Sequence, residues 1–198
     1  MAALALFDAT GQWQDTLVCE HRIGPWLQGL GVSWGVLQLG PAPEPDEPGA
    51  EAWLQAQQGR LATLGQGLGL HRIDRVRVTS GQPGWPALRQ QFTQEHRHSE
   101  AELRVFLAGA GLFTVRHPEG FVGLLCEAGD WVALPAGLAH SFDAGAEPHF
   151  DALRLLGQAE GWVAQPSGLQ RPELPDFDAF VSQLLEQTGY ASPDDLVC

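Results

Sequence analysis

The sequence predicts a mainly β protein with a few helices, built around a sandwich or a small barrel. Between residues 93 and 156, short apolar runs recur at close spacing and are separated by Gly, Pro and Asp. This pattern is typical of strands joined by turns, without helices between them. In addition, 44% of the 198 residues are hydrophobic, which is enough for a sizeable buried core. We therefore expect one domain over residues 1–198.

The N-terminal part, residues 1–89, is expected to mix helices and strands. Proline and acidic residues fill positions 40–49, and they cannot form regular structure. Around this loop, the apolar spacing predicts a strand at 32–39, a helix at 50–68, a strand at 75–79 and a short helix at 86–92 that begins at a proline.

The barrel core is expected over residues 90–166. Its strands are predicted at 103–108, 112–116, 122–127, 131–134, 140–143 and 150–156. Gly109-Ala110-Gly111 predicts a hairpin between the first two strands, because glycine supplies the positive φ that a tight turn needs. Residues 176–188 carry apolar side chains at helical spacing, so residues 170–198 are expected to form a C-terminal helical tail packed on the barrel.

The charge of the chain excludes several functions. Eleven basic residues against 24 acidic ones give a net charge of −13, and all eleven are Arg. The absence of Lys excludes Schiff-base chemistry and a phosphate-loop lysine. An acidic chain without basic runs argues against nucleic acid and against an anionic membrane surface. The N-terminus lacks the basic flank of a signal peptide, and no run approaches the roughly 18 apolar residues of a membrane helix, so we expect a cytoplasmic monomer.

A cluster of histidines indicates a metal site. On extended backbone His96 and His98 lie on one face, and Glu102 and Arg104 share their parity. A chain with 7 His and 13 Glu would contain the spacing H-x-H-x-x-x-E roughly 0.02 times by chance. A solvated histidine cluster on the rim of the barrel is the simpler alternative.

A second block strengthens the metal hypothesis. Pro135 and Gly137 predict a bend just before His140, which can bring that histidine onto a strand facing the first pair. Three imidazoles and one carboxylate would fill four positions of an octahedron and leave two adjacent positions open. This suits a divalent Fe, Ni, Mn or Co ion that binds a bidentate substrate, whereas a structural zinc site is closed and tetrahedral.

These two blocks resemble the two motifs of the cupin superfamily, whose fold is a double-stranded β-helix, or jelly-roll barrel. More narrowly, the chain resembles the bacterial acireductone dioxygenases. The residues that carry the resemblance are Phe92, Glu95, His96, His98, Glu102, Arg104, the run Gly109–Phe113, the run Leu134–His140 and the run 160–165. The likeness is dense over 90–166 and looser over 1–89. The chain departs from the pattern at Ala101, where relatives carry an acid, and at Ala144, where an Asn is common.

The resemblance implies an activity. Such enzymes cleave 1,2-dihydroxy-3-keto-5-methylthiopentene, an acireductone, with O2 in methionine salvage. The Fe²⁺ form yields formate and 4-methylthio-2-oxobutanoate, and the Ni²⁺ form yields formate, carbon monoxide and 3-methylthiopropionate. The expected cofactor is one Fe²⁺ or Ni²⁺ per subunit, and the expected partners are the acireductone and O2.

The resemblance also implies roles for individual residues. His96, His98, Glu102 and His140 match metal ligands, Arg104 matches an arginine that generates or holds the substrate dianion, and Glu95 matches a position associated with metal incorporation. A dianion approaching a chain of charge −13 needs local positive charge, which a metal and a buried Arg supply. The candidate substrate pocket consists of Phe92, Phe106, Phe142, Arg154 and Trp162.

Other interpretations stay open at this point. The chain could be another cupin dioxygenase or isomerase with the same ligands, acting for example on a flavonol or a diketone, or a cupin that binds metal without catalysis. Arg104 could be a structural partner of Glu102, and the aromatic residues could be ordinary core. The remaining histidines, His21, His71, His117 and His149, are expected to be surface residues or locally bonded.

Overall fold

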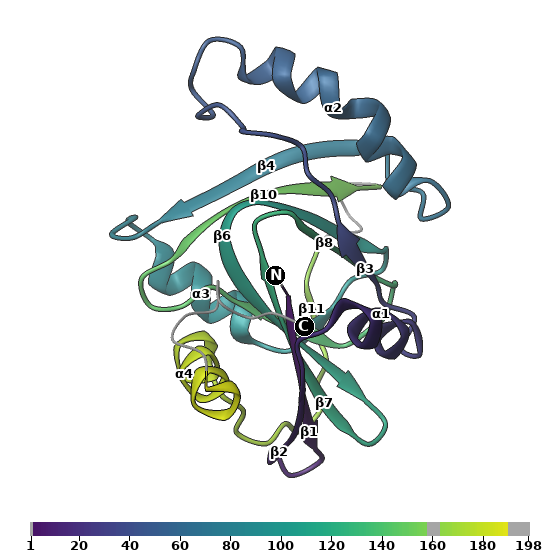
Figure 1. Cartoon of the computed structure of the whole chain (residues 1–198), viewed down its shortest axis with the longest axis vertical. Coiled ribbons are helices and arrows are strands. Elements are labelled where there is room, and N and C mark those ends of the chain that lie inside the picture. The colour runs from purple at the N-terminus through teal and green to yellow at the C-terminus, as the bar shows by residue number, and fades with distance from the viewer. Residues whose placement is uncertain (1, 158–162, 190–198) are drawn as a thin grey trace.

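The protein folds as an antiparallel β-barrel in which one long strand joins two sheets (Figure 1). The computed structural model describes residues 2–157 and 163–189. In the first sheet the strands follow the order β11 (Gln165–Pro166), β5 (His96–Arg97), β9 (His140–Asp143), β6 (Glu102–His117), β7 (Gly120–Glu127), β1 (Ala3–Asp8) and β2 (Trp13–Leu17). In the second sheet the order is β4 (Arg72–Thr79), β10 (His149–Leu156), β6, β8 (Asp130–Leu134) and β3 (Ser33–Val36). The expectation of a mainly β barrel is confirmed.

The predicted hairpin at residues 109–111 is wrong, because this segment lies inside the single strand β6. The first half of β6 pairs with β8 and β10, and its second half pairs with β7 and β9. Gly109 has φ of +68°, and a Cβ built there would lie 1.8 Å from the carbonyl oxygen of His149. The glycine therefore lets the strand pass from one sheet to the other beside a neighbouring backbone, instead of turning it back.

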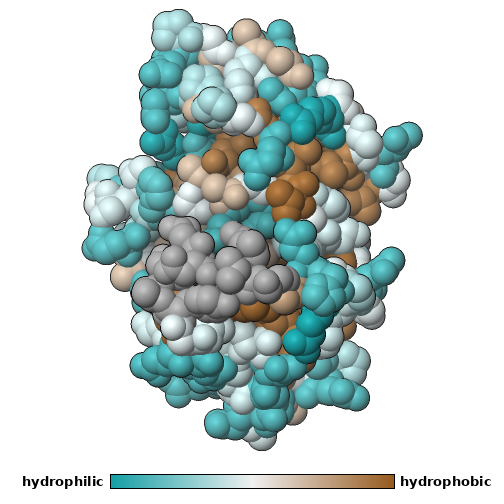
Figure 2. All heavy atoms as spheres, viewed as in Figure 1, coloured by the Kyte–Doolittle hydropathy of each residue, from teal (hydrophilic) through white to brown (hydrophobic). Residues whose placement is uncertain are grey.

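In the part of the chain that the structure describes, four helices surround the barrel: α1 (Glu20–Gln28), α2 (Ala50–Gly65), α3 (Trp85–Thr93) and α4 (Phe177–Thr188). The sequence predicted the last three within a few residues and predicted neither α1 nor the strands β1, β2 and β11. Helix α2 lies over β4 and β10, and apolar surface is visible between this upper layer and the barrel (Figures 1 and 2). Among the described residues, no helix has the length and apolar character that a membrane crossing requires.

The side chains of β6 alternate between two environments, one outside the barrel and one inside it. Leu103 and Val105 point outward and pack with Leu61 of α2 in one apolar cluster. Phe106 belongs instead to the cluster that fills the barrel, together with Phe142. Because side chains alternate along a strand, Glu102 and Arg104 share the inward parity of Phe106. Two charged side chains therefore enter the barrel directly above its aromatic core.

Candidate metal centre

Three histidines meet at one end of the barrel. His96 of β5 lies directly opposite His140 of β9. His98 follows β5, and its carbonyl oxygen accepts a hydrogen bond of 2.9 Å from the backbone of Gly137, in the bend before β9. All three side chains are buried, and one ring nitrogen from each lies within 4.8 Å of the others. The predicted bend at 135–137 thus brings His140 to the first pair.

Backbone contacts orient two of these rings. Nδ1 of His96 donates to the carbonyl oxygen of Gln94 at 2.7 Å, and Nδ1 of His140 donates to that of Leu138 at 2.9 Å. A carbonyl oxygen only accepts, so Nδ1 carries the proton and Nε2 of the neutral ring keeps its lone pair for a ligand. Burial lowers the pKa of His96, which favours this neutral form.

Glu102 completes the group. Its Oε2 lies 3.0 Å from Nε2 of His140 and 3.2 Å from Nε2 of His98. With Nδ1 of His140 protonated, Nε2 and Oε2 are both acceptors, and their close approach is favourable only with a proton or a cation between them. Adjacent ligands of an octahedral ion with bonds of about 2.1 Å lie about 3.0 Å apart, so the residues present fit a divalent metal.

Neighbouring groups keep the carboxyl of Glu102 ionised. Burial acts to raise the pKa of this carboxyl, but the positive charge of Arg104 beside it lowers the pKa, which lies well below its usual range. Nε of Arg104 donates to Oε1 of Glu102 at 2.7 Å. The carboxylate is therefore ionised and oriented, with one oxygen toward the arginine and the other toward the histidines.

Arg104 lies in an aromatic cage. Its guanidinium carbon is 4.3 Å from the ring centre of Phe142, 5.3 Å from that of Phe113 and 5.9 Å from that of Phe92. Burial lowers the pKa of Arg104, yet a guanidinium starts so high that it stays charged. The aromatic faces offset part of the desolvation of this cation.

The structure distributes the predicted pocket residues over several places. Phe92 and Phe142 contact Arg104, whereas Phe106 lies deeper, in contact with Phe142 and Phe113. Phe113 was missed as a member of the cage, because the change of sheet at Gly109 breaks the parity that relates it to Arg104. Trp162 lies outside the described residues.

Arg154 lies directly opposite Arg104 in the register of β10 and β6, and Asp74 of β4 lies opposite Arg154. Nε of Arg154 donates to Oδ1 of Asp74 at 2.8 Å. A row of charges thus runs across the inner face of the sheet, from Asp74 through both arginines to Glu102. Asp74 was missed from the sequence, where nothing in its neighbourhood marks it.

The partners of Glu95 differ from those of the three histidines. Its side chain is 7% exposed, and it receives hydrogen bonds from Nε of Arg116 at 2.9 Å and from Oγ of Ser167 at 2.5 Å. The other histidines lie apart from the centre: His71 bonds the carbonyl oxygen of Gly69, and His117 packs edge-on against Trp26. Ala101 and Ala144 are both buried among apolar side chains.

A barrel that gathers three histidines, a carboxylate and a caged arginine at one mouth defines a metal-binding protein of the cupin class. The model of the ARD/ARD′ family matches residues 61–164 of this chain. The chain belongs to this family.

Named relatives agree with the family. The chain is 41% identical over 172 residues to an acireductone dioxygenase of Pseudomonas syringae pv. syringae, a match that covers 85% of this chain and 93% of the relative. It is 40% identical over 176 residues to an acireductone dioxygenase of Cronobacter sakazakii, covering 85% and 94%. A solved acireductone dioxygenase from Bacillus anthracis, with a cadmium ion in its active centre, has the same fold at a TM-score of 0.73 and 21% identity, covering 83% and 97%.

Proposed function

We propose that this chain is a metal-dependent acireductone dioxygenase, which cleaves 1,2-dihydroxy-3-keto-5-methylthiopentene with O2. The observation that carries the proposal is the juxtaposition of Glu102 and three histidines with Arg104, in a chain that matches relatives of this name over nearly their whole length. With Fe²⁺ the expected products are formate and 4-methylthio-2-oxobutanoate. With Ni²⁺ they are formate, carbon monoxide and 3-methylthiopropionate. The reaction would serve methionine salvage.

The metal ligands in this proposal are His96, His98, Glu102 and His140. Their ring nitrogens and carboxylate suit one Fe²⁺ or Ni²⁺ per subunit, because both ions accept a mixture of imidazole and carboxylate ligands. When bound, such an ion supplies Lewis-acid stabilisation of the ionised enediol and, for Fe²⁺, redox chemistry with O2. Support for a metal here comes also from the cadmium ion in the active centre of the Bacillus anthracis relative.

Arg104 would bind the substrate dianion. Its guanidinium lies beside Glu102, inside a wall of three phenylalanines that keeps water away. Charges interact far more strongly in such a partly desolvated site than in water, so one arginine can hold an anion that the net charge of −13 repels at long range. The fixed position of the cation lowers the cost of reorganisation as negative charge shifts during the reaction.

The substrate pocket is proposed to lie beside Arg104. In this proposal the half-buried Phe92 offers apolar surface to the methylthio tail, while Phe142 and Phe106, which are buried in the barrel core, pack behind it. Arg154 adds positive charge from the neighbouring strand, moderated by its ion pair with Asp74. Trp162 is kept in this pocket on the family resemblance alone.

Reconstitution of the full-length chain tests the proposal. Metal-free protein is loaded with Fe²⁺ and mixed with the acireductone, and O2 uptake and metal content are measured. We expect O2 uptake by wild type, none by His96→Ala together with loss of bound metal, and normal activity in the control His71→Ala, whose side chain is exposed. Absence of O2 uptake in wild type that holds one ion per chain would refute the proposal.

Product analysis separates the two metal forms and the competing functions. Keto acid from the Fe²⁺ protein and carbon monoxide from the Ni²⁺ protein are the expected results. Uptake of O2 with a flavonol or a diketone instead of the acireductone would favour another dioxygenase. A cytoplasmic location and a monomeric state stay predictions, which fractionation of cells and sedimentation of the purified chain can check.

A further inference from the structure

A strap of chain, residues 165–176, crosses the edge of the sheet beside the metal centre. At its start, β11 pairs with β5, so that Pro166 lies opposite His96 and Gln165 lies opposite Arg97. Strand β5 has only two residues, and on its other side it pairs with β9 at the single position His96–His140. So short a strand has few hydrogen bonds of its own, and its position depends on these neighbours.

Glu95, the residue before His96, is the hub between the strap and the barrel. Its carboxylate receives Nε of Arg116 from β6 and Oγ of Ser167 from the strap, at 2.9 Å and 2.5 Å. Its carbonyl oxygen receives the backbone N–H of Ser167 at 3.0 Å. Nη2 of Arg116 then donates to the carbonyl oxygen of Gln170 at 2.8 Å, so one arginine holds both β5 and the strap.

The same strap also holds β9. Nη1 of Arg171 donates to Oγ of Ser141, the residue after His140, at 2.9 Å. On the other side of His140, the carbonyl oxygen of Ala139 receives the backbone N–H of Arg116 at 3.0 Å. The strap and Arg116 thus contact the residues next to both paired histidines.

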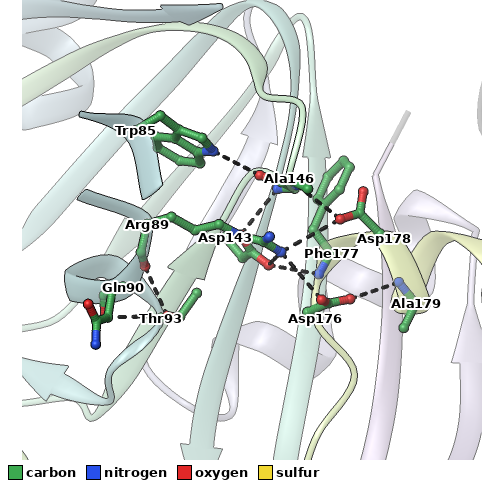
Figure 3. A network of polar contacts seen from close by, with 11 residues as sticks. Trp85, Arg89, Gln90, Thr93, Asp143, Ala146, Asp176, Phe177, Asp178 and Ala179 are labelled. Carbon is green, nitrogen blue, oxygen red and sulfur yellow. Dashed lines mark hydrogen bonds and ion pairs between the residues drawn. The ribbon is translucent and has the colours of Figure 1, made fainter. Parts of the chain in front are cut away.

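The far end of the strap is anchored by α4 (Figure 3). Asp176 caps this helix by accepting the N–H of Ala179. Asp143, at the end of β9, accepts the N–H of Phe177 at 2.9 Å and a bidentate pair from Arg89 of α3, at 2.7 Å and 2.8 Å. Arg89 and hydrogen bonds from the backbone hold the pKa of Asp143 below its usual range against the effect of burial, so this anchor is charged.

We propose that the strap, Glu95 and Arg116 form a clamp that holds β5 against β9 and thereby slows the release of the metal ion. The proposal rests on the metal centre proposed above. An ion leaves a site of several ligands by losing them one after another, and a ligand held nearby rebinds before the next is lost. Glu95, Arg116 and Ser167 are in this view positioning residues, which act on the histidines through the backbone.

The protein contains a matched control for Arg116. Arg75 of β4 donates Nε to Asp151, whose side chain is 7% exposed like that of Glu95, and donates Nη1 to the carbonyl oxygen of Pro43. It therefore makes the same types of contact, but from the outward parity of β4, on the face of the sheet opposite to Arg104. Arg75→Lys and Arg116→Lys should cost similar stability.

The experiment measures metal release, not turnover. The full-length wild type, Arg116→Lys, Arg75→Lys, Ser167→Ala and Ser167→Thr are each loaded with Co²⁺. Transfer of the ion to excess EDTA is then followed by its visible absorption, well below the unfolding temperature of each variant. We expect release to be about tenfold faster in Arg116→Lys, because a hydrogen bond to a charged group contributes about that factor. Release should be severalfold faster in Ser167→Ala, near wild type in Ser167→Thr, and within about twofold of wild type in Arg75→Lys.

Equal release rates in Arg116→Lys and Arg75→Lys would overturn the clamp, since any effect would then follow general stability. If Arg116→Lys does not fold, the two Ser167 variants test the proposal. The clamp is then overturned if Ser167→Ala releases the metal no faster than Ser167→Thr does. Wild type that holds no Co²⁺ at all would refute the proposed metal centre itself, and the clamp with it. The two failures are therefore distinguishable.

Discussion

The two faces of the sheet formed by β4, β10 and β6 use the same strands for opposite purposes. The outer face carries Leu103 and Val105 under α2, and its buried ion pair joins Arg75 to Asp151. The inner face carries Arg104 and Arg154 in adjacent positions, where two cations repel each other. Like charges side by side cost stability, and on this face Glu102 and Asp74 each offset one of the two arginines. The proposed function gives this charged row a role, which is to bind the substrate anion.

The largest effect is expected from a substitution on the inner face. Replacing Arg104 by Met removes the buried cation and keeps much of the side-chain volume, so kcat/KM for the acireductone should fall about a thousandfold. Arg104→Lys should recover little of it, because an ammonium cannot reproduce the planar contacts with Glu102 and Phe142. Steady-state kinetics on protein with measured metal content tests this. Full activity of metal-loaded Arg104→Met would show that Arg104 is only a structural partner of Glu102.

The second largest effect is expected from a substitution on the outer face. Leu103 is fully buried in the cluster with Leu61, and its replacement by Ala should lower the free energy of unfolding by about 3 kcal/mol. Because its neighbours Glu102 and Arg104 point the other way, activity per bound metal ion should stay within about twofold of wild type. Urea unfolding and kinetics give the two numbers. A loss of activity as large as that of Arg104→Met would contradict the separation of the two faces.

A smaller effect is expected at a second buried carboxyl, which lies on β8, the neighbour of β6 in the same sheet. Asp130 of β8 is 2% exposed, and burial raises its pKa from 3.8 to about 6. Its hydrogen bond comes from the neutral backbone of Glu127, whereas Glu102 has Arg104. The folded state thus binds the proton of Asp130 more tightly than the unfolded state does. The cost of its charge is absent below about pH 4, grows between about pH 4 and 6, and is constant above.

Asp130→Asn should therefore unfold with a free energy about 2 kcal/mol higher than wild type at pH 7.5. The advantage should shrink as the pH falls through 6 toward 4. Denaturant unfolding of both proteins at pH 7.5 and pH 5 measures the difference. An advantage that is the same at both pH values would mean that Asp130 is charged at the same pH in the folded and unfolded states.

Much of the fold and of the site followed from local patterns. The short apolar runs located β7 to β10, and the helical spacing located α2 and α4, because the periods of strands and helices are properties of the chain itself. The spacing of His96, His98 and Glu102 and the bend before His140 indicated the group that the structure brings together. The hairpin at 109–111 failed because glycine permits both a turn and a change of sheet, and only the neighbouring strand decides between them.

The residue types of the site are evident from the local sequence: histidines and a carboxylate at strand spacing, an arginine two positions further, and no lysine anywhere. The distant residues that complete the site are evident only once the chain is folded. Asp74 beside Arg154, Phe113 beside Arg104, and Ser167 with Arg116 at Glu95 are separated along the chain by tens of residues or by a change of sheet. The physical reason is that hydrophobic periodicity fixes the face of each element, while the register between elements is set by the packing of the whole barrel.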